Sequence, residues 1–261
     1  MKKEHAMRPC VVLPCFFKNT DYCHAVKKVA AIGYDAVELW GWGGIDPVCV
    51  KAILDETGVE LISLCTTEFR LNNPEYREAF LDGLKRTCEF ASLLGAKRII
   101  TQVGNDTGDD RLVQQRAIID GLKAAAPILE KHGIILMIEP LNTLFDHKGY
   151  YLTSSKEAFD IVREINSPYI KVIFDIYHQQ ITEGNIIPNI VNNLQYIAHL
   201  HGAGHPGRHE IWLGESNYEA IIDAVDKAGY EGALGLEYFP TLDTEKSLGE
   251  ALKLFKKEKA L

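Results

Sequence analysis

The chain has 261 residues, 46% of them hydrophobic, which is enough for one sizeable core. Its 28 Lys and Arg against 36 Asp and Glu give a formal net charge of −8, so no global basic field exists to attract nucleic acid or anionic lipid. No apolar run approaches the roughly 20 residues of a membrane span. We therefore expect neither a nucleic-acid partner nor a membrane partner.

The cysteines and the N-terminal region indicate the cellular compartment. All six cysteines lie in the first third of the chain and include no C-x-x-C pair, a usage typical of a reduced, cytoplasmic protein with mostly buried thiols. The apolar run from Val11 to Phe17 is short, is broken by Pro14 and is followed by Lys18. It suits a first strand better than a signal peptide.

Strand-like and helix-like segments alternate along the chain. The expected strands cover residues 11–17, 36–40, 61–65, 98–103, 135–139, 170–177, 197–203 and 233–238. The segments between them are amphipathic, and two of them end on Gly95 and Gly133, as helices commonly do. The stretch "SNYE", from Ser216 to Glu219, has the form of a capping box that opens a further helix.

This alternation predicts the fold class. Eight strand–helix repeats in a chain of this length match a (β/α)8 TIM barrel, an α/β fold in which parallel strands close into a ring inside a layer of helices. A doubly wound open sheet gives the same alternation, but eight repeats of this size favour closure. Because the chain shows no low-complexity linker and no break in composition, we expect residues 1–261 to form a single barrel domain.

Polar residues stand at the carboxyl ends of the last four expected strands. Side chains alternate faces along a strand, so "ILMIE", "KVIFD", "IAHLH" and "LGLE" each combine an outward apolar pair with an inward polar end. Barrels of this class build their active sites at that end. The inward residues that we expect to converge there are Glu139, Asp175, His201 and Glu237.

These four residue types are suited to a metal ion. Three carboxylates in one apolar mouth repel each other unless a cation lies among them. Glu, Asp and His are suitable ligands for Mn²⁺, Mg²⁺ or Co²⁺, whereas a thiolate-type zinc site is disfavoured. Taken singly, each residue is as well explained by a helix cap or an ion pair with Lys or Arg. Four of them at equivalent positions favour a site for one divalent cation.

The same part of the chain resembles a known family. The stretches "IEPLN", "FDIYHQQ", "HLHGAGHPGRHE", "GESNY" and "GLEY" are similar to those of the hydroxypyruvate isomerase group. They occur in order and at natural spacing between Gly133 and Phe239. That group belongs to the xylose isomerase-like TIM barrels. The amino-terminal half resembles the family mainly in its strand–helix rhythm.

The resemblance implies roles for particular residues. Glu139 and Glu237 correspond to the family's pair of proton-transfer carboxylates, and His178 and Arg208 correspond to its substrate contacts. The metal ligands correspond to Glu139, Asp175, His201 and Glu237.

The chemistry of these residues fits an isomerase acting on a small sugar or keto acid. Moving a carbonyl between adjacent carbons requires an enediolate, which a chelated divalent metal stabilises while two carboxylates remove and return the proton. The Arg208 guanidinium suits the carboxylate of a 2-keto acid such as hydroxypyruvate. The alternative is a surface arginine paired with Glu210 or Glu215.

Other substrates and activities stay open. Sugar 3-epimerases of this superfamily carry a further glutamate where this chain has Phe145, which is followed by Asp146. This difference favours hydroxypyruvate or a 2-oxo-tetronate over a ketose. A ketose 3-epimerase, or an inosose isomerase or dehydratase, is the alternative on the same site. An endonuclease IV-like DNA repair enzyme is disfavoured, because it needs more histidines and a basic groove. Homo-oligomerisation is left open.

A few further residues lie near strand ends. Glu38 and Glu68 either line the barrel mouth or take part in helix caps and salt bridges. His199 is expected in the barrel layer beneath the metal or as a support for His201. Trp42 is expected to form an aromatic wall facing the substrate.

Overall fold

A computed structural model describes residues 7–18 and 20–256. Within this part of the chain, eight parallel strands form one closed barrel in chain order, with the last strand paired to the first. This confirms the predicted (β/α)8 fold. The strands are β1 (Arg8–Val12), β2 (Ala36–Glu38), β3 (Glu60–Cys65), β4 (Arg98–Thr101), β5 (Ile135–Ile138), β6 (Ile170–Asp175), β7 (Ile197–Gly202) and β8 (Ala233–Leu236).

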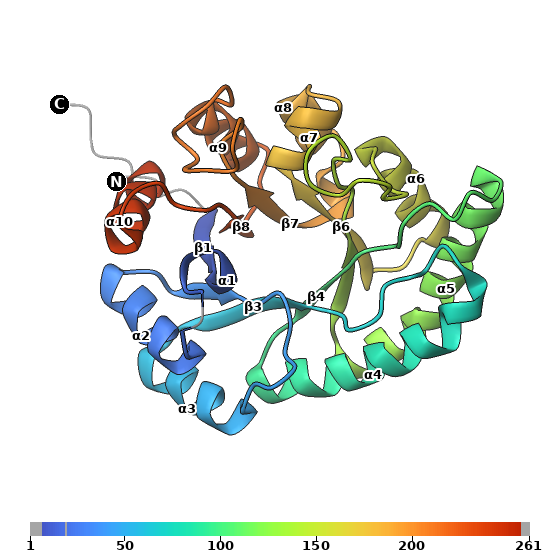
Figure 1. Ribbon diagram of the computed structural model, residues 1–261, viewed down its shortest axis with the longest axis horizontal. Helices are drawn as coiled ribbons and strands as arrows, with labels where there is room; N and C mark the ends of the chain where they lie inside the picture. The colour runs from blue at the N-terminus through green and yellow to red at the C-terminus, as the bar shows by residue number, and fades with distance from the viewer. Residues whose placement is uncertain (1–6, 19, 257–261) are drawn as a thin grey trace.

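Helices surround the strands, and Figure 1 shows them as an outer ring. Two short 3₁₀ turns, at Pro74–Tyr76 and Leu194–Tyr196, precede α4 and β7. The described α-helices are α1 (Leu13–Phe16), α2 (Tyr22–Ile32), α3 (Pro47–Thr57), α4 (Arg77–Leu94), α5 (Arg111–His132), α6 (Ser155–Ile165), α7 (Ile176–Thr182), α8 (Ile186–Val191), α9 (Tyr218–Lys227) and α10 (Thr244–Phe255).

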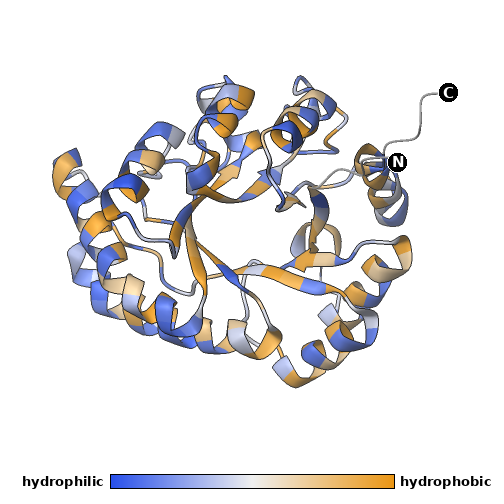
Figure 2. Cartoon of the chain, turned by 180° about the vertical axis from the view of Figure 1, so that it is seen from behind, coloured by the Kyte–Doolittle hydropathy of each residue, from blue (hydrophilic) through white to orange (hydrophobic). Residues whose placement is uncertain are grey.

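The buried apolar side chains fall into an outer and an inner layer. Outward strand residues such as Leu136 and Phe174 belong to the large cluster that the helices cover. Ile100, Met137 and Ile173 form a small separate cluster of inward residues. Figure 2 shows the strands largely in hydrophobic colours and the helices with mixed faces. The inward polar positions further along the same strands therefore face the barrel axis.

The first strand ends earlier than expected. β1 starts at Arg8 and stops at Val12, and the next residues form the short helix α1, with Pro14 near its start. Proline lacks the N–H that a further ladder bond would need, and it fits the first turn of a helix. The expectation that this strand extends to Phe17 is therefore wrong.

The helix ends agree with the sequence except at one cap. Gly95 and Gly133 take the left-handed conformation directly after α4 and α5, as expected. At the start of α9, however, it is Asn217 and not Ser216 whose side chain accepts the Ala220 backbone N–H. The capping box was therefore placed one residue too early, since Asn is an equally good N-cap.

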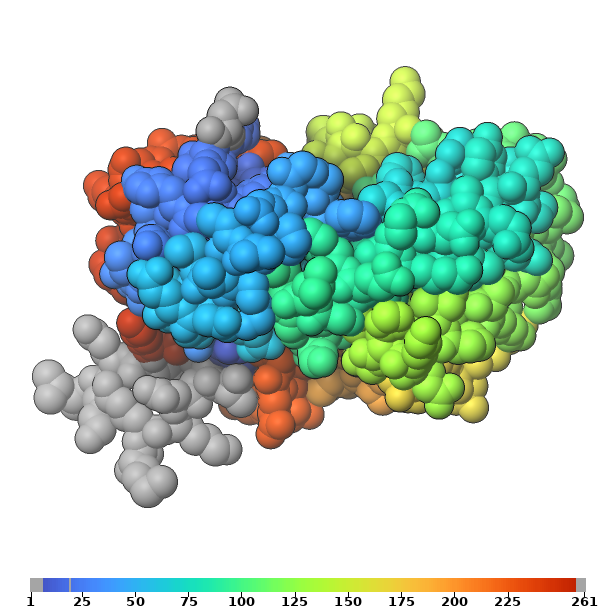
Figure 3. All heavy atoms as spheres, turned by 90° about the horizontal axis from the view of Figure 1, so that it is seen from below, coloured from blue at the N-terminus to red at the C-terminus, as the bar shows by residue number. Residues whose placement is uncertain are grey.

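The helices cover the barrel as surface elements. Figure 3 shows one side of the molecule, on which segments of the first half of the chain, coloured blue to green, follow one another. Among the described residues, no helix combines the length and the apolar character needed to cross a lipid bilayer.

Candidate active site

The register of the last strands aligns their carboxyl ends. Asp175 of β6 lies opposite His201 of β7, and His201 lies opposite Gly235 of β8. Glu139 and Glu237 each follow the last residue of their strand, β5 and β8. All four predicted side chains are buried, and one ligand atom of each lies within 4.8 Å of the others. The structure thus brings the predicted cluster together.

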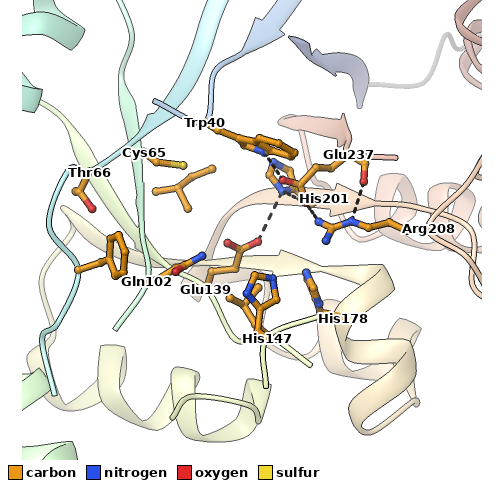
Figure 4. A pocket seen from close by; sticks show the side chains of 13 residues that line it. Trp40, Cys65, Thr66, Gln102, Glu139, His147, His178, His201, Arg208 and Glu237 are labelled. Carbon is orange, nitrogen blue, oxygen red and sulfur yellow. Dashed lines mark hydrogen bonds and ion pairs between the residues drawn. The ribbon is translucent and has the colours of Figure 1, made fainter. Parts of the chain in front are cut away.

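The imidazole of His201 presents a bare nitrogen to this cluster. Its Nδ1 lies 3.7 Å from Glu139 Oε1 and 3.5 Å from Glu237 Oε2 (Figure 4). Within the described part of the chain, this buried Nδ1 has no hydrogen-bond partner. A buried nitrogen without a partner is costly unless it binds something. The position of His201 Nδ1 is therefore that expected of a metal-ligand atom.

Burial and mutual repulsion disfavour ionised carboxyl groups here. Burial, with the charge of Glu237, raises the pKa of Glu139 to about 8. The same two causes raise the pKa of Asp175 to about 6. The pKa of Glu237 moves the opposite way: burial favours its neutral form, but Arg208 and His201 hold the pKa below its usual range. A divalent cation among these groups would relieve the repulsion, so the donor set fits an Mn²⁺-, Mg²⁺- or Co²⁺-type ion.

Glu38 lies beneath this cluster, inside the barrel. Its carboxylate is fully buried and accepts hydrogen bonds from His199 Nε2 at 2.8 Å, His201 Nε2 at 3.2 Å and the Ser63 hydroxyl. Because a carboxylate only accepts, Nε2 of His201 carries a proton, and Nδ1 is the ring nitrogen that faces the cluster. Burial disfavours a charged ring, but Glu38 and Glu237 raise the pKa of His201 well above its ordinary value, so Nδ1 would lose its proton on binding a cation. Glu38 therefore neither lines the mouth nor caps a helix, and His199 lies beneath the cluster as expected.

Gly235 makes room for this arrangement. A Cβ at this position would lie 2.5 Å from Glu38 Oε1 and 2.5 Å from the His201 ring. Real Cβ atoms do not approach neighbours so closely, and both neighbours are held by hydrogen bonds. The glycine in "ALGLEY" is therefore a packing requirement of the site.

A cavity of about 380 Å³ opens over the cluster. Figure 4 shows His178 and Arg208 on one side of it and Thr66, Cys65 and Gln102 on the other. The first side carries a guanidinium and an imidazole, whereas the three residues named on the second side carry no ionised group that could bind a carboxylate. The lining residues are Trp40, Cys65, Thr66, Phe69, Ile100, Gln102, Glu139, Leu141, His147, His178, His201, Arg208 and Glu237.

The aromatic wall is formed by Trp40 and not by Trp42. The Trp40 indole N–H donates to Glu237 Oε1 at 2.6 Å, and its ring lines the cavity. Trp42 stacks on Phe90 and donates to the Thr87 hydroxyl, away from the cavity. The expectation for Trp42 is therefore wrong. Both residues lie just beyond β2, where no strand periodicity shows which side chain points inward.

Arg208 lies in the site and not at the surface. Its Nη2 donates to Glu237 Oε2, its Nε donates to the Glu237 carbonyl at 3.3 Å, and its guanidinium packs over Tyr177. Glu210 is occupied elsewhere, accepting hydrogen bonds from Thr241. Arg208 also has a φ of 56°, a left-handed conformation that non-glycine residues seldom adopt and that clusters at functional sites. The alternative of an ion pair with Glu210 or Glu215 is wrong.

His178 is buried at the edge of the cavity. Burial, together with the charge of Arg208, lowers the pKa of His178 well below its ordinary value, so the imidazole is neutral. Its Nδ1 is hydrogen-bonded to Asn142. Asn142 was not singled out from the sequence, although it ends the quoted stretch "IEPLN". His147 also lines the cavity and was missed, since it lies in a loop without periodicity.

Glu68 lies outside the cluster. It binds Arg70 through its side chain, an ion pair that lowers the pKa of Glu68 to about 2. Glu68 thus takes the salt-bridge role that was one of its two predicted roles.

Comparisons with known proteins place the chain among enzymes of one architecture. A closed (β/α)8 barrel with an acidic, histidine-containing cavity at the carboxyl end of its strands is the usual design of a barrel enzyme. The model of the xylose isomerase-like TIM barrel family matches residues 26–258. The chain therefore belongs to the xylose isomerase-like TIM barrel family.

Several relatives carry names that state an isomerase activity. The chain is 30% identical to a hydroxypyruvate isomerase of Escherichia coli (strain K12), over 90% of this chain and 95% of the relative. It is 34% identical to a 2-oxo-tetronate isomerase of Pectobacterium atrosepticum, over 92% and 94%. A crystal structure titled as an AP endonuclease, family 2, from Brucella melitensis superposes with a TM-score of 0.88 at 26% identity, covering 93% of this chain and 96% of that one.

Proposed function

We propose that this chain is a single-domain, divalent metal-dependent isomerase that moves a carbonyl between C2 and C3 of a short 2-keto acid. Hydroxypyruvate and a 2-oxo-tetronate are the two substrates that the names of its relatives support. The observation that carries the proposal is the buried cluster of three carboxylates and one bare histidine nitrogen beneath a cavity that also contains Arg208.

The cluster would hold one divalent cation. Its ligands would be Glu139, Asp175, His201 Nδ1 and Glu237, all of which lie within reach of one another. A cation bound there supplies Lewis acid chemistry, stabilising the negative charge that develops on substrate oxygens. Glu38 keeps the His201 proton on Nε2 and so leaves Nδ1 free to bind.

Glu139 and Glu237 are the proposed proton-transfer groups. They extend from the ends of β5 and β8 and approach the His201 ring nitrogen from two directions (Figure 4). One carboxylate takes the proton from the carbon beside the carbonyl, and the other delivers a proton to the neighbouring carbon. Trp40 and Arg208 hydrogen-bond the two oxygens of Glu237 and hold this carboxylate in place.

The polar side of the cavity supports a substrate with a carboxylate. Arg208 supplies a guanidinium fork and His178 supplies an imidazole on the same side (Figure 4). Asp146, the nearest acidic residue in the loop after β5, accepts hydrogen bonds from Asn142 Nδ2 and the Tyr177 hydroxyl. It is thus engaged and poorly placed to accept from sugar hydroxyls. Phe145 is 64% exposed and contributes no acceptor.

A substrate panel tests the proposal. The purified protein is assayed with added Mn²⁺ on hydroxypyruvate, 2-oxo-tetronates, ketohexoses and inososes. We expect turnover of a 2-keto acid, abolished by a chelator and restored by Mn²⁺. Turnover of ketohexoses or inososes alone would replace the proposal with an epimerase or inosose-directed activity.

One further substrate belongs in the panel because of the solved relative named as an AP endonuclease. A DNA duplex with an abasic site is included, and we expect no cleavage. The chain carries a net charge of −8, and its cavity of about 380 Å³ is lined by side chains that suit a small acid. Cleavage with no isomerase activity would overturn the proposal.

A further inference from the structure

His178 has two ring nitrogens in different surroundings. Its Nδ1 receives the side-chain amide of Asn142 at 2.7 Å and the Asn142 backbone N–H at 3.3 Å. Its Nε2 is buried and has no hydrogen-bond partner within the part of the chain that the structure describes. The Asp175 carboxylate is 3.6 Å from this Nε2, beyond hydrogen-bond distance. His178 lines the cavity, so the partnerless nitrogen belongs to the site.

The orientation of the Asn142 amide is fixed by its own partners. Its Oδ1 accepts the backbone N–H groups of Phe145 and Asp146, at 3.0 and 3.4 Å. Its Nδ2 donates to the Asp146 carboxylate at 2.8 Å, which leaves the second amide hydrogen for His178. Turning the amide over would place N–H against N–H and oxygen against a carboxylate. The end that faces His178 is therefore a donor.

Two donors pointing at Nδ1 determine where the imidazole carries its proton. A ring nitrogen that accepts hydrogen bonds cannot itself bear a hydrogen, so the neutral ring of His178 is protonated at Nε2. An Nε2–H group can donate to an oxygen in the cavity. It offers no lone pair to a metal ion and cannot take a proton from carbon.

His201 shows the opposite arrangement on the same cavity. There the Glu38 carboxylate accepts a hydrogen bond from Nε2–H, and Nδ1 faces Glu139 and Glu237. His201 thus turns Nδ1 toward the cavity, as a ligand for a cation, whereas His178 turns Nε2 toward it. In each case the neighbour behind the ring makes the assignment: a carboxylate for His201 and an amide for His178.

We propose that Asn142, oriented by Asp146, is a positioning residue that holds His178 as its Nε2–H tautomer, making it a fixed hydrogen-bond donor to a substrate oxygen. Its relevance to turnover rests on the proposed function, in which that oxygen belongs to a 2-keto acid. Arg208 and His178 then both donate hydrogen bonds from the same side of the cavity. Two donors favour a substrate group that only accepts hydrogen bonds, such as a carboxylate or carbonyl oxygen, over a hydroxyl group that must donate.

Nuclear magnetic resonance tests the tautomer directly. Long-range ¹H–¹⁵N spectra of the full chain, labelled at its histidines and free of added metal, report which ring nitrogen is protonated. A His178→Gln variant assigns the signals. We expect an unprotonated Nδ1 and a protonated Nε2 at pH 8. An Nδ1–H tautomer in the wild-type protein would overturn the proposal.

Asn142→Asp tests the cause. A carboxylate at position 142 accepts at both oxygens, so His178 should switch to carrying its proton on Nδ1. Asp146→Asn is the matched variant, because an amide oxygen still accepts from Asn142 and should leave the tautomer unchanged. Asn192→Asp, an exposed position, controls for the added negative charge. An unaltered tautomer in a folded Asn142→Asp protein would contradict the proposal.

If Asn142→Asp fails to fold, Asn142→Ala takes its place. It removes the 2.7 Å side-chain donor and keeps the backbone N–H, so the His178 signals should show a mixture of tautomers in exchange. A single Nε2–H tautomer as sharp as in wild type would show that the Asn142 side chain is not the cause.

The link to catalysis is measured separately. In Asn142→Asp, His178 Nε2 would lose its hydrogen and become an acceptor that faces a charged substrate oxygen. KM for hydroxypyruvate should therefore rise by roughly 10-fold or more. The KM in the exposed control Asn192→Asp should stay unchanged. Titration of labelled wild-type protein with hydroxypyruvate should shift the His178 Nε2–H signal. If His178 carries its proton on Nε2 but its signal does not respond to hydroxypyruvate, the proposed substrate is wrong and the role of Asn142 in fixing the tautomer still holds. If His178 carries its proton on Nδ1, the inference about Asn142 is wrong and the proposed function is unaffected.

Discussion

Glu38 illustrates how one buried side chain can control another. Its hydrogen-bond partners among the described residues include no Lys or Arg, and burial by itself would raise the pKa of a carboxyl group. Burial is nevertheless outweighed by His199 and His201, which hold the pKa of Glu38 well below its usual range. The carboxylate is thus charged because of the two imidazoles, and it fixes their orientation in return.

Glu38→Gln should weaken divalent cation binding. The amide can offer either an oxygen or an N–H to His201, so the ring is no longer held with Nδ1 facing the cluster. We expect a roughly 10- to 100-fold loss of Mn²⁺ affinity, measured by calorimetry. Glu68→Gln, which breaks an ion pair with Arg70 at a neighbouring strand end, is the control and should keep its affinity. If Glu38→Gln binds Mn²⁺ as tightly as the wild-type protein and the Glu68→Gln control do, Glu38 has no part in metal binding.

Glu139→Gln and Glu237→Gln distinguish a ligand from a proton carrier. A glutamine oxygen can still coordinate a metal ion, but it cannot accept a proton. Both variants should stay nearly inactive at saturating Mn²⁺, with a rate loss of roughly 10²-fold or more. The variant that keeps the proton-abstracting carboxylate should still exchange substrate hydrogen with deuterium from solvent. Near-normal turnover of either variant would mean that its carboxylate is structural.

Arg208→Lys should separate an acidic substrate from a neutral one. Lysine keeps the positive charge but loses the fork that binds a carboxylate through two parallel hydrogen bonds. KM for hydroxypyruvate should rise by about 10-fold, while inhibition by dihydroxyacetone, its neutral analogue, should change by about twofold or less. Equal losses for the two compounds would remove the role in carboxylate recognition.

At the scale of elements, the carboxyl ends of β5 to β8 carry the site. Their pattern was predictable because side chains alternate faces along a strand and each of these strands leads into a polar residue at its carboxyl end. The inward direction of Glu139, Asp175, His201 and Glu237 therefore follows from the sequence. β2 is only three residues long, too short for alternation to show that Glu38 points inward or that Trp40 lines the cavity. The partners of Asn142 lie in a loop and in another element, so its role depends on three-dimensional contacts that no local pattern contains.

Gly235→Ala should disturb the site from the inside of β8. The added methyl would meet the Glu38 carboxylate and the His201 ring, which have little freedom to move. Overpacking of this kind lowers the free energy of unfolding by about 1–3 kcal/mol. The affinity for Mn²⁺ should also fall. Gly249→Ala in α10, where the methyl would meet nothing within 4 Å, is the control and should be neutral or stabilising. Urea denaturation and calorimetry measure both, and unchanged stability with unchanged affinity in Gly235→Ala would contradict the packing requirement.

At the scale of the whole molecule, the carboxyl cluster couples stability to pH. Burial, with repulsion by Glu237, raises the pKa of Glu139 to about 8 and that of Asp175 to about 6 in the folded protein. Raised folded-state pKa values mean that the folded chain holds these protons more tightly than the unfolded chain. Their contribution to stability is therefore full at pH values below the unfolded pKa values near 4, and it is lost as the pH rises through about 6 and then about 8.

Metal binding should show the opposite pH dependence. A cation binds the deprotonated carboxylates, so it competes with protons at low pH and replaces lost stability at high pH. The increase in Tm on adding saturating Mg²⁺ should thus be larger at pH 8 than at pH 6, as measured by differential scanning calorimetry. Asp175→Asn should lose most of the increase at both pH values. An increase in Tm that is the same at both would mean that these carboxyl groups do not titrate in this range.

The hydrogen bond from Trp40 to Glu237 joins residues 197 positions apart, across the seam where β8 pairs with β1, which in turn pairs with β2. During synthesis, the residues that supply the early strands leave the ribosome long before Glu237 exists. The last carboxylate and the indole that holds it meet only when the ring of strands closes. We therefore expect assembly of the four-residue cluster to be one of the final events in folding, because contacts between distant segments form late. A chain that stops short of β8 would retain three of the four cluster residues, lack Glu237 and leave the barrel open.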